Sequence, residues 1–324
     1  MKPFTLTCLS LCLLISVSAC GPVIVPPTPI PVQDVAYHLA WSPDDRWLAA
    51  SGTSGLYLLD TQTYKQKAFF SDAKNAEITF GSRLMAATDG ETIQVWDLSD
   101  DRPLFIQHAA PINFQSVAIS RDDKLLVTGE QKHFRVWSMP DGALLADIPA
   151  PGFVSNATFK DDGTLVVVIQ YKALIQTWDV KAQKLLHSFE IPRDVTFFSM
   201  SRDGKILLVD YNDAGFQLWD IPTGKPQLYY RDAISGAGWE RLSANDRFAA
   251  TWGYANEKGS GLSVWDLSDG TRVHEFLTPV FNGDGWRGAA LNSDGSRLAA
   301  SDNTGNIYFY KVAGGETKGR FHLP

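Results

Sequence analysis

The side chains of this sequence that could carry chemistry include six histidines, of which two share a repeated position. His187 and His274 each stand nine residues after a tryptophan, Trp178 and Trp265 respectively. The remaining histidines show neither the H-x-x-x-H nor the C-x-x-C spacing of a metal site. We interpret His187 and His274 as surface positions of a repeated unit. The scattered ones are His38, His108, His133 and His322.

Aspartates recur in short polar segments between apolar runs, where paired carboxylates could suggest acid–base chemistry. Because they recur at one position of a repeat, we expect them to stabilise tight turns instead. The segments 281–286 (FNGDGW) and 301–306 (SDNTGN) resemble calcium loops in composition but lack the alternating Asp and distal Glu. We therefore expect no catalytic residue, no cofactor and no metal. The turn aspartates are Asp44, Asp122, Asp161, Asp203 and Asp294.

An internal repeat positions all of these residues. The hexapeptide VWDLSD occurs at 95–100 and again at 264–269, and Trp-Asp pairs also begin at Trp178 and Trp219. Trp137-Ser138 lies 41 residues from the pairs on either side. Before each pair, an apolar run ends at a polar Ser-Asp-Gly-like turn and a second apolar run follows, which is the pattern of a β-hairpin. The period predicts short β-strands repeated along the chain.

Seven units of about 41 residues, each with four short strands, predict an all-β, seven-bladed β-propeller over residues 35–324. The Trp-Asp pairs and the Ser-x-Asp-Gly turns resemble the WD-repeat family. The Gly-His dipeptide of that family is missing, and Gly90 stands where an Asp is usual, so we expect its buried Trp-His-Asp-Ser network to be absent. Because the seventh unit has its own outer strand (TKGRFHL), we expect closure without strand exchange.

The N-terminus has the features of a targeting segment. Residues 1–19 contain one Lys and an apolar stretch, and Val17-Ser18-Ala19-Cys20 resembles the bacterial lipobox. The resemblance implies that Cys20 is lipidated, with a palmitate chain, and that the exported protein is anchored to the cell membrane or outer membrane. An ordinary signal peptide cut near Ala19 is the alternative.

Residues 20–34 read as a tether, since five prolines in the 14 residues from Gly21 favour extended backbone. Alternatively, residues 23–25 (VIV) could add an edge strand to the propeller. After cleavage Cys20 is the remaining cysteine, which excludes a disulfide in the folded part. The net charge of −7 and the absence of basic runs argue against nucleic acid as a partner.

Large aromatic side chains cluster in the connections that the WD-repeat resemblance assigns to one face of the ring, the B–C and D–A loops. The sixth unit has a long B–C loop, TWGYANEKGSG at 251–261. Exposed aromatics are typical of partner surfaces, although they could equally staple the loops down. The predicted partner-binding residues are Trp239, Trp252, Tyr254, Phe281, Trp286, Tyr171 and Tyr211.

These observations predict a monomeric, non-catalytic, membrane-anchored interaction module that binds a protein or peptide of the cell envelope. The alternative is a propeller enzyme, or a glycan or small-molecule binder, with its site at the channel mouth. That alternative requires charged residues to converge there. Glu77, Glu240 and Arg241 are the candidates on the predicted inner strands.

Overall fold

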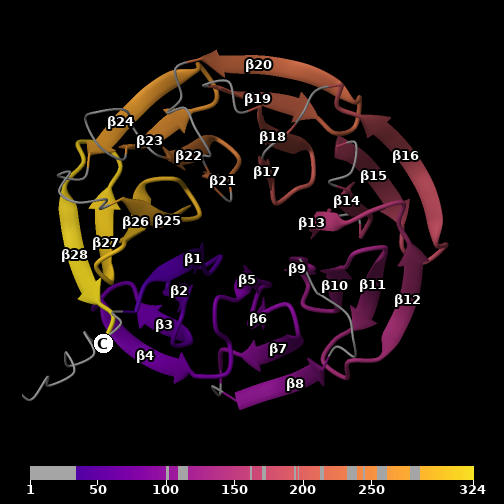
Figure 1. Cartoon of the computed structure of the whole chain (residues 1–324), viewed down its shortest axis with the longest axis horizontal. Coiled ribbons are helices and arrows are strands. Elements are labelled where there is room, and N and C mark those ends of the chain that lie inside the picture. Colours follow the sequence, from indigo (N-terminus) through magenta and orange to yellow (C-terminus); the bar gives the residue numbers. More distant parts are fainter. Residues whose placement is uncertain are drawn as a thin grey trace, which may run out of the picture. The chain divides into compact units, whose positions relative to one another are not determined.

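Seven four-stranded antiparallel sheets surround a central axis in the computed structural model (Figure 1). The structure describes residues 34–99, 102–108, 116–160, 163–169, 173–192, 195, 197–211, 215–231, 239–243, 245–253, 261–277 and 285–324. The predicted seven-bladed β-propeller is confirmed.

Each blade consists of four consecutive strands, named A to D from the axis outward. Blade 1 contains β1 (Ala36–Trp41), β2 (Trp47–Gly52), β3 (Leu56–Asp60) and β4 (Lys65–Phe70). Blade 2 contains β5 (Glu77–Phe80), β6 (Leu84–Thr88), β7 (Thr92–Asp97) and β8 (Arg102–His108). Blade 3 contains β9 (Ser116–Ile119), β10 (Leu125–Gly129), β11 (His133–Ser138) and β12 (Leu144–Pro149). Blade 4 contains β13 (Val154–Phe159), β14 (Leu165–Ile169), β15 (Leu174–Asp179) and β16 (Lys184–Glu190).

The second half of the chain follows the same plan. Blade 5 contains β17 (Phe197–Met200), β18 (Ile206–Asp210), β19 (Gly215–Asp220) and β20 (Lys225–Arg231). Blade 6 contains β21 (Trp239–Leu242), β22 (Phe248–Gly253), β23 (Gly261–Asp266) and β24 (Thr271–Leu277). Blade 7 contains β25 (Trp286–Leu291), β26 (Arg297–Asp302), β27 (Asn306–Lys311) and β28 (Thr317–His322).

The hydrophobic core lies between neighbouring blades. The B strands are apolar on both faces because a blade lies on either side of them, and all five residues of β14 (LVVVI) are buried. Their side chains divide between two clusters: Val167 packs toward blade 3, and Val166 packs toward blade 5. The indoles of Trp137, Trp178, Trp219 and Trp265 each donate a hydrogen bond within their own blade. Trp137 and Trp265 each donate Nε1–H to a B-strand threonine, Thr128 or Thr251, at 3.1 Å.

The ring closes where blade 1 meets blade 7, and each of these blades is made of its own four consecutive strands. Trp41 donates its indole N–H to the Ala290 carbonyl at 2.9 Å, and Ser301 donates its hydroxyl to the Ala36 carbonyl at 2.8 Å. The prediction of closure without strand exchange is confirmed.

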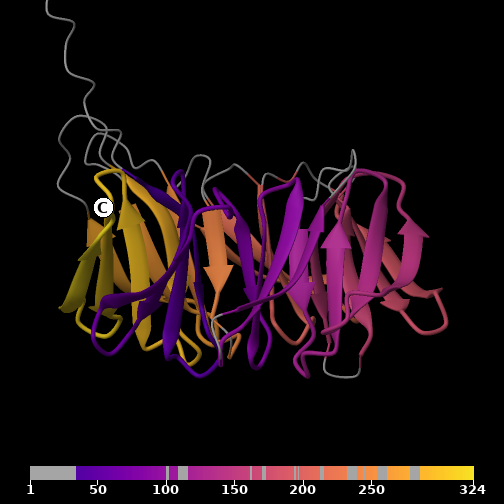
Figure 2. The same ribbon diagram turned by 90° about the horizontal axis from the view of Figure 1, so that it is seen from below.

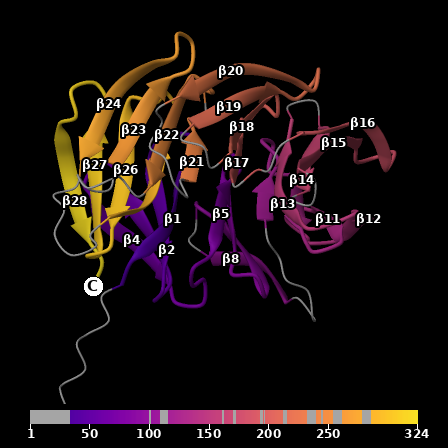
Figure 3. The ribbon, with the colours of Figure 1, turned by 45° about the horizontal axis from the view of Figure 1, so that its top comes forward.

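The strands run between the two faces of the ring, as the edge-on and tilted views show (Figures 2 and 3). Because the strands of a blade are antiparallel, the A–B and C–D turns lie at one face, and the B–C and D–A connections lie at the other. We call the first the A–B face and the second the B–C face. Within the described ranges, no helix is long and apolar enough to cross a membrane.

Candidate interaction site at the central channel

The aspartates that suggested paired carboxylates hold turns at the A–B face. Asp44 Oδ1 accepts hydrogen bonds from the Ser42 hydroxyl at 2.6 Å and the Arg46 amide at 3.1 Å. The same pattern recurs at Asp122 and Asp203, and Asp294 accepts from the Ser296 amide at 2.9 Å. The predicted turn role is therefore confirmed for these four. Asp161 lies outside the described residues.

In six blades the fourth residue of the A–B turn has a left-handed backbone, which favours glycine. Gly163, Gly204 and Gly295 stand there in blades 4, 5 and 7, with φ of 79°, 66° and 74°. In blades 1, 3 and 6 the residue is Asp45, Asp123 or Asp246, each with φ of 59°. A non-glycine residue is strained in this conformation, so its side chain must contribute enough to offset the strain.

All three of these aspartates reach back to the turn of the preceding blade. Asp45 accepts from the Ser293 amide at 2.7 Å. Asp123 accepts from the Ser82 and Arg83 amides, each at 2.8 Å, and Asp246 accepts from the Arg202 amide at 3.3 Å. These carboxylates therefore join neighbouring blades at three of the boundaries between blades, which we call seams. We call Asp45, Asp123 and Asp246 the seam aspartates.

The surroundings of Asp246 change its protonation. Burial, together with the nearby Asp203 carboxylate, raises the pKa of Asp246 to about 7. The seam between blades 5 and 6 therefore contains a carboxyl group that titrates near neutral pH.

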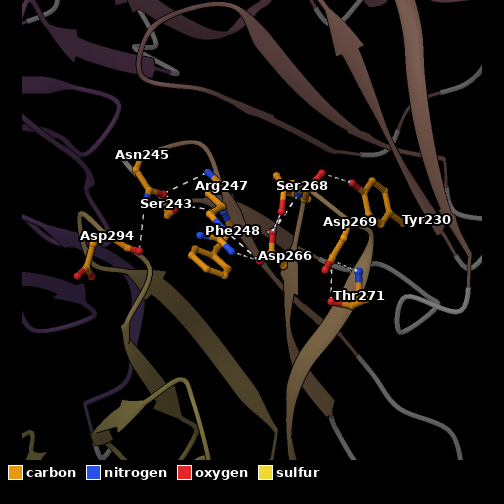
Figure 4. Close-up of polar contacts among 11 residues, drawn as sticks. Tyr230, Ser243, Asn245, Arg247, Phe248, Asp266, Ser268, Asp269, Thr271 and Asp294 are labelled. Carbon is orange, nitrogen blue, oxygen red and sulfur yellow. Dashed lines mark hydrogen bonds and ion pairs between the residues drawn. The ribbon is translucent and has the colours of Figure 1, made fainter.

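The duplicated hexapeptide builds one polar network twice at the A–B face. In blade 6, Asp266 Oδ1 accepts from the amide and hydroxyl of Ser268, and Arg247 Nη2 lies 2.7 Å from Asp266 Oδ2 (Figure 4). Blade 2 repeats this with Asp97, Ser99 and Arg83. The hydrogen bonds from Arg247 lower the pKa of Asp266 to about 2. The repeated sequence thus serves a C–D turn.

A cavity of about 270 Å³ occupies the central channel and reaches the A–B face. The A strands or A–B turns of all seven blades line it. Arg121 and Arg202 come from the turns of blades 3 and 5, and Asn156 and Thr158 come from β13 between them. The mouth thus combines two guanidinium groups with hydroxyl and amide side chains.

The structure describes the side chain of only one of the three residues considered for an enzyme site, Glu77, Glu240 and Arg241. Glu77 of β5 lines the cavity, as does His38 of β1. The side chains of Glu240 and Arg241 on β21 lie outside the described residues. The convergence that the enzyme alternative requires is thus not tested by these three residues.

Three of the predicted partner-binding aromatics belong to the core. Trp252 and Trp286 are 3% and 6% exposed and pack together between blades 6 and 7. Tyr211 is 6% exposed, and its hydroxyl accepts from Trp219 Nε1 at 2.7 Å. The prediction that these three side chains are exposed is wrong. Trp252 lies near the end of the B strand β22, Tyr211 directly follows the B strand β18, and Trp286 begins the A strand β25. Each side chain packs between two blades, where the neighbouring blade covers it.

The exposure of the other predicted partner-binding side chains is outside the part of the chain that the structure describes. Tyr171, Tyr254 and Phe281 lie outside the described residues, as does Cys20, and nothing is described of the Trp239 side chain on β21. The partner-binding face remains a prediction.

One polar site had no signal in the sequence pattern. Asp34 directly precedes β1 and is 1% exposed. Its carboxylate accepts from the Thr53 hydroxyl at 2.7 Å, the Ser54 amide at 3.1 Å and the Tyr57 hydroxyl at 2.9 Å. Burial raises the pKa of Asp34, but these hydrogen bonds outweigh it and leave the pKa below its usual value. The start of the propeller is thereby fixed to the B–C turn of blade 1.

The side chains that could bind a metal ion can also be located in the structure. Among the described residues, no group of three His, Cys, Asp or Glu side chains is arranged to hold a metal ion. In the segment 301–306, Asp302 Oδ1 accepts from the amides of Thr304 and Asn306, each at 2.9 Å. This segment is a B–C turn stabilised by its own aspartate.

The fold and the repeats define the class: a seven-bladed β-propeller built from Trp-Asp-type repeats. No protein-family model matches the chain. It is similar to U3 small nucleolar RNA-interacting protein 2 of Homo sapiens, at 29% identity over 116 residues. The match covers 30% of this chain and 24% of that protein, so it spans about a quarter of the relative's length. This similarity supports the WD-repeat character of the propeller.

Proposed function

We propose that this protein is a non-catalytic interaction module, anchored at the cell envelope by a lipid on Cys20, which binds an acidic protein or peptide segment. The observation that carries the proposal is the channel mouth at the A–B face, lined by Arg121 and Arg202 on a chain of net charge −7. Opposite charge at a mouth guides an acidic partner and sets its orientation.

The turn carboxylates next to these arginines in the sequence, Asp122 and Asp203, each form an ion pair with a lysine of the same turn. Asp122 lies 3.1 Å from Lys124 Nζ, and Asp203 lies 2.7 Å from Lys205 Nζ. Their charges are therefore offset within the turns. Arg121 and Arg202 belong to blades 3 and 5 and are separated by blade 4, which suits an extended acidic segment rather than a single ion.

Asp34 fixes the start of β1 at the B–C face. This proposal replaces the buried aromatics as the contact residues.

An affinity capture tests the binding site. The full chain, purified in detergent, serves as bait for solubilised envelope of its own cells, beside an Arg121→Glu/Arg202→Glu variant. A Lys318→Glu/Arg320→Glu variant on outer strand β28 makes the same charge change as a control. We expect a partner that is retained by the wild type and the control, lost by the mouth variant, and weakened by salt. Equal retention by all three baits would contradict the proposal.

A separate experiment tests the anchor. Cells that express the full chain or Cys20→Ser are labelled with an alkyne palmitate analogue and fractionated. We expect label and membrane association for the wild type and neither for the variant. An unlabelled wild-type chain in the soluble fraction would refute the lipid anchor while leaving the binding site open.

The cavity itself favours a second candidate, a glycan or small-molecule binder. A volume of about 270 Å³ lies near the lower limit for small-ligand pockets. A thermal-shift screen of anionic sugars and organic acids tests this candidate. It succeeds if a ligand stabilises the wild type and the Arg121→Glu/Arg202→Glu change abolishes that shift.

A further inference from the structure

A second cavity, of about 780 Å³, lies at the A–B face between blades 3 and 4. The A–B turns of both blades and the C–D turn of blade 4 line it. Its volume lies within the range of ligand-binding pockets. We call this cavity the blade 3–4 groove.

The groove is open because blade 4 has a glycine, Gly163, at the turn position of the seam aspartates. A β-carbon placed on Gly163 meets no atom within 4 Å, apart from its neighbours in the chain. The two other glycine turns are filled by a side chain. A β-carbon on Gly204 would clash with Lys160, and a β-carbon on Gly295 would clash with Phe248. Of the three glycine turns, the one at Gly163 therefore leaves space for an added side chain.

Basic residues outnumber acidic ones among the described residues that line the groove. Asp122 forms an ion pair with Lys124 of its own turn at 3.1 Å. Asp179 accepts a hydrogen bond from the Ala182 amide of its own turn at 3.0 Å. On a chain of net charge −7, a groove of this composition favours an anionic ligand. The charged lining residues are Arg121, Lys124, Lys160 and Lys181, with Asp122 and Asp179.

The groove meets the channel mouth at Arg121, which lines both cavities. Lys181 belongs to the C–D turn of blade 4, which is farther from the axis than the A–B turns. Basic residues therefore continue from the mouth toward the outer rim of the ring. Because they are spread over separate turns, they suit several carboxylates along one extended chain rather than one compact ion.

We propose that the acidic segment that enters the channel mouth leaves it along the blade 3–4 groove, with one of its carboxylates beside Gly163. That carboxylate takes the place that a seam aspartate occupies at three other boundaries between blades. The inference rests on the acidic partner proposed above. It adds the path of the bound segment, a run of acidic residues that reaches from Arg202 to Lys181.

A direct binding measurement tests this path. The probe is fluorescein-labelled hexaglutamate, added at low salt to the full chain in detergent and followed by fluorescence anisotropy. Gly163→Asp places a carboxylate in the groove, in a conformation that aspartate adopts at the same position of blades 1, 3 and 6. We expect it to raise the dissociation constant by about tenfold or more. Gly314→Asp is the matched control, because Gly314 also has a left-handed backbone and open space, in the C–D turn of blade 7.

A pair of lysines provides a second test that leaves the glycine backbone unchanged. Lys181→Ala removes a charge from the groove, and we expect it to weaken binding of hexaglutamate several-fold. Lys184→Ala removes the same charge three residues later, at the start of β16 and outside the groove lining, and should leave binding unchanged. Hexaglutamine, the uncharged probe, should not bind.

Arg202→Glu separates this inference from the proposed function, because Arg202 lines the mouth and not the groove. If Arg202→Glu loses the probe while Gly163→Asp and Lys181→Ala bind it like the wild type, the groove is refuted and the mouth stands. If only the two groove variants lose the probe, the groove stands and the mouth is refuted. A wild type that does not bind hexaglutamate refutes the inference, and the affinity capture still decides the proposed function. Thermal melting of every variant confirms folding.

Discussion

The Asp45 carboxylate crosses the seam that closes the ring and accepts a hydrogen bond from the Ser293 backbone amide at 2.7 Å. It also accepts from the Ser293 hydroxyl and the Asn292 side-chain amide, each at 2.8 Å. Without strand exchange, the first and last blades are held together by side chains. Asp45 therefore helps to hold the ring closed at the boundary between the first and last blades, which no strand exchange spans.

Replacing Asp45 by glycine tests this latch, because glycine suits the left-handed backbone and removes only the carboxylate. We expect a loss of about 1–2 kcal/mol in the free energy of unfolding, from lost hydrogen bonds partly offset by relieved strain. Urea denaturation measures it. Asp44→Gly removes a carboxylate that bonds within its own turn and is the matched control. An unchanged midpoint for Asp45→Gly would show that the latch adds nothing.

The Asp246 carboxyl predicts a pH dependence at the seam between blades 5 and 6. Its pKa is about 7 in the folded protein against a usual value of 3.8, so the folded state binds more protons between these pH values. This group therefore reduces stability as pH rises from about 4 to about 7. Asp246→Asn cannot ionise and keeps an oxygen acceptor for the Arg202 amide. We expect the variant's advantage in melting temperature to grow over that range. A constant difference would contradict it.

Because Trp252 and Trp286 are buried between blades 6 and 7, we expect both side chains to stabilise the fold. Trp252→Ala or Trp286→Ala removes a large side chain from the core between blades 6 and 7, and we expect a loss of about 3–5 kcal/mol for each. Leu228→Ala, at a side chain 55% exposed, should change stability by less than about 0.5 kcal/mol. Chemical denaturation compares them. A loss for either tryptophan as small as that for Leu228 would argue against its burial.

Asp34 should control how firmly the first strand is held. Asp34→Ala leaves the Tyr57 hydroxyl and the Ser54 amide without their acceptor, which costs about 1–3 kcal/mol. We expect faster hydrogen exchange in β1 and earlier proteolysis next to it, with the other blades protected. Asp72→Ala, an exposed carboxyl in the same blade, is the control. Unchanged exchange in β1 would show that Asp34 does not fix the strand.

The sequence by itself determined the repeat, the number of blades, the mode of closure and the turn role of Asp44, Asp122, Asp203 and Asp294. These properties depend on residues near one another in the chain, and sevenfold repetition makes a local pattern unmistakable. The tertiary structure decided which side chains are covered. Trp252, Trp286 and Tyr211 looked like contact residues because their loops are irregular, yet neighbouring blades bury them. The seam aspartates were equally hidden, since a turn residue does not reveal that its carboxylate binds the previous blade. Contacts between blades join residues about 40 or more positions apart, and only packing of the closed ring brings them together.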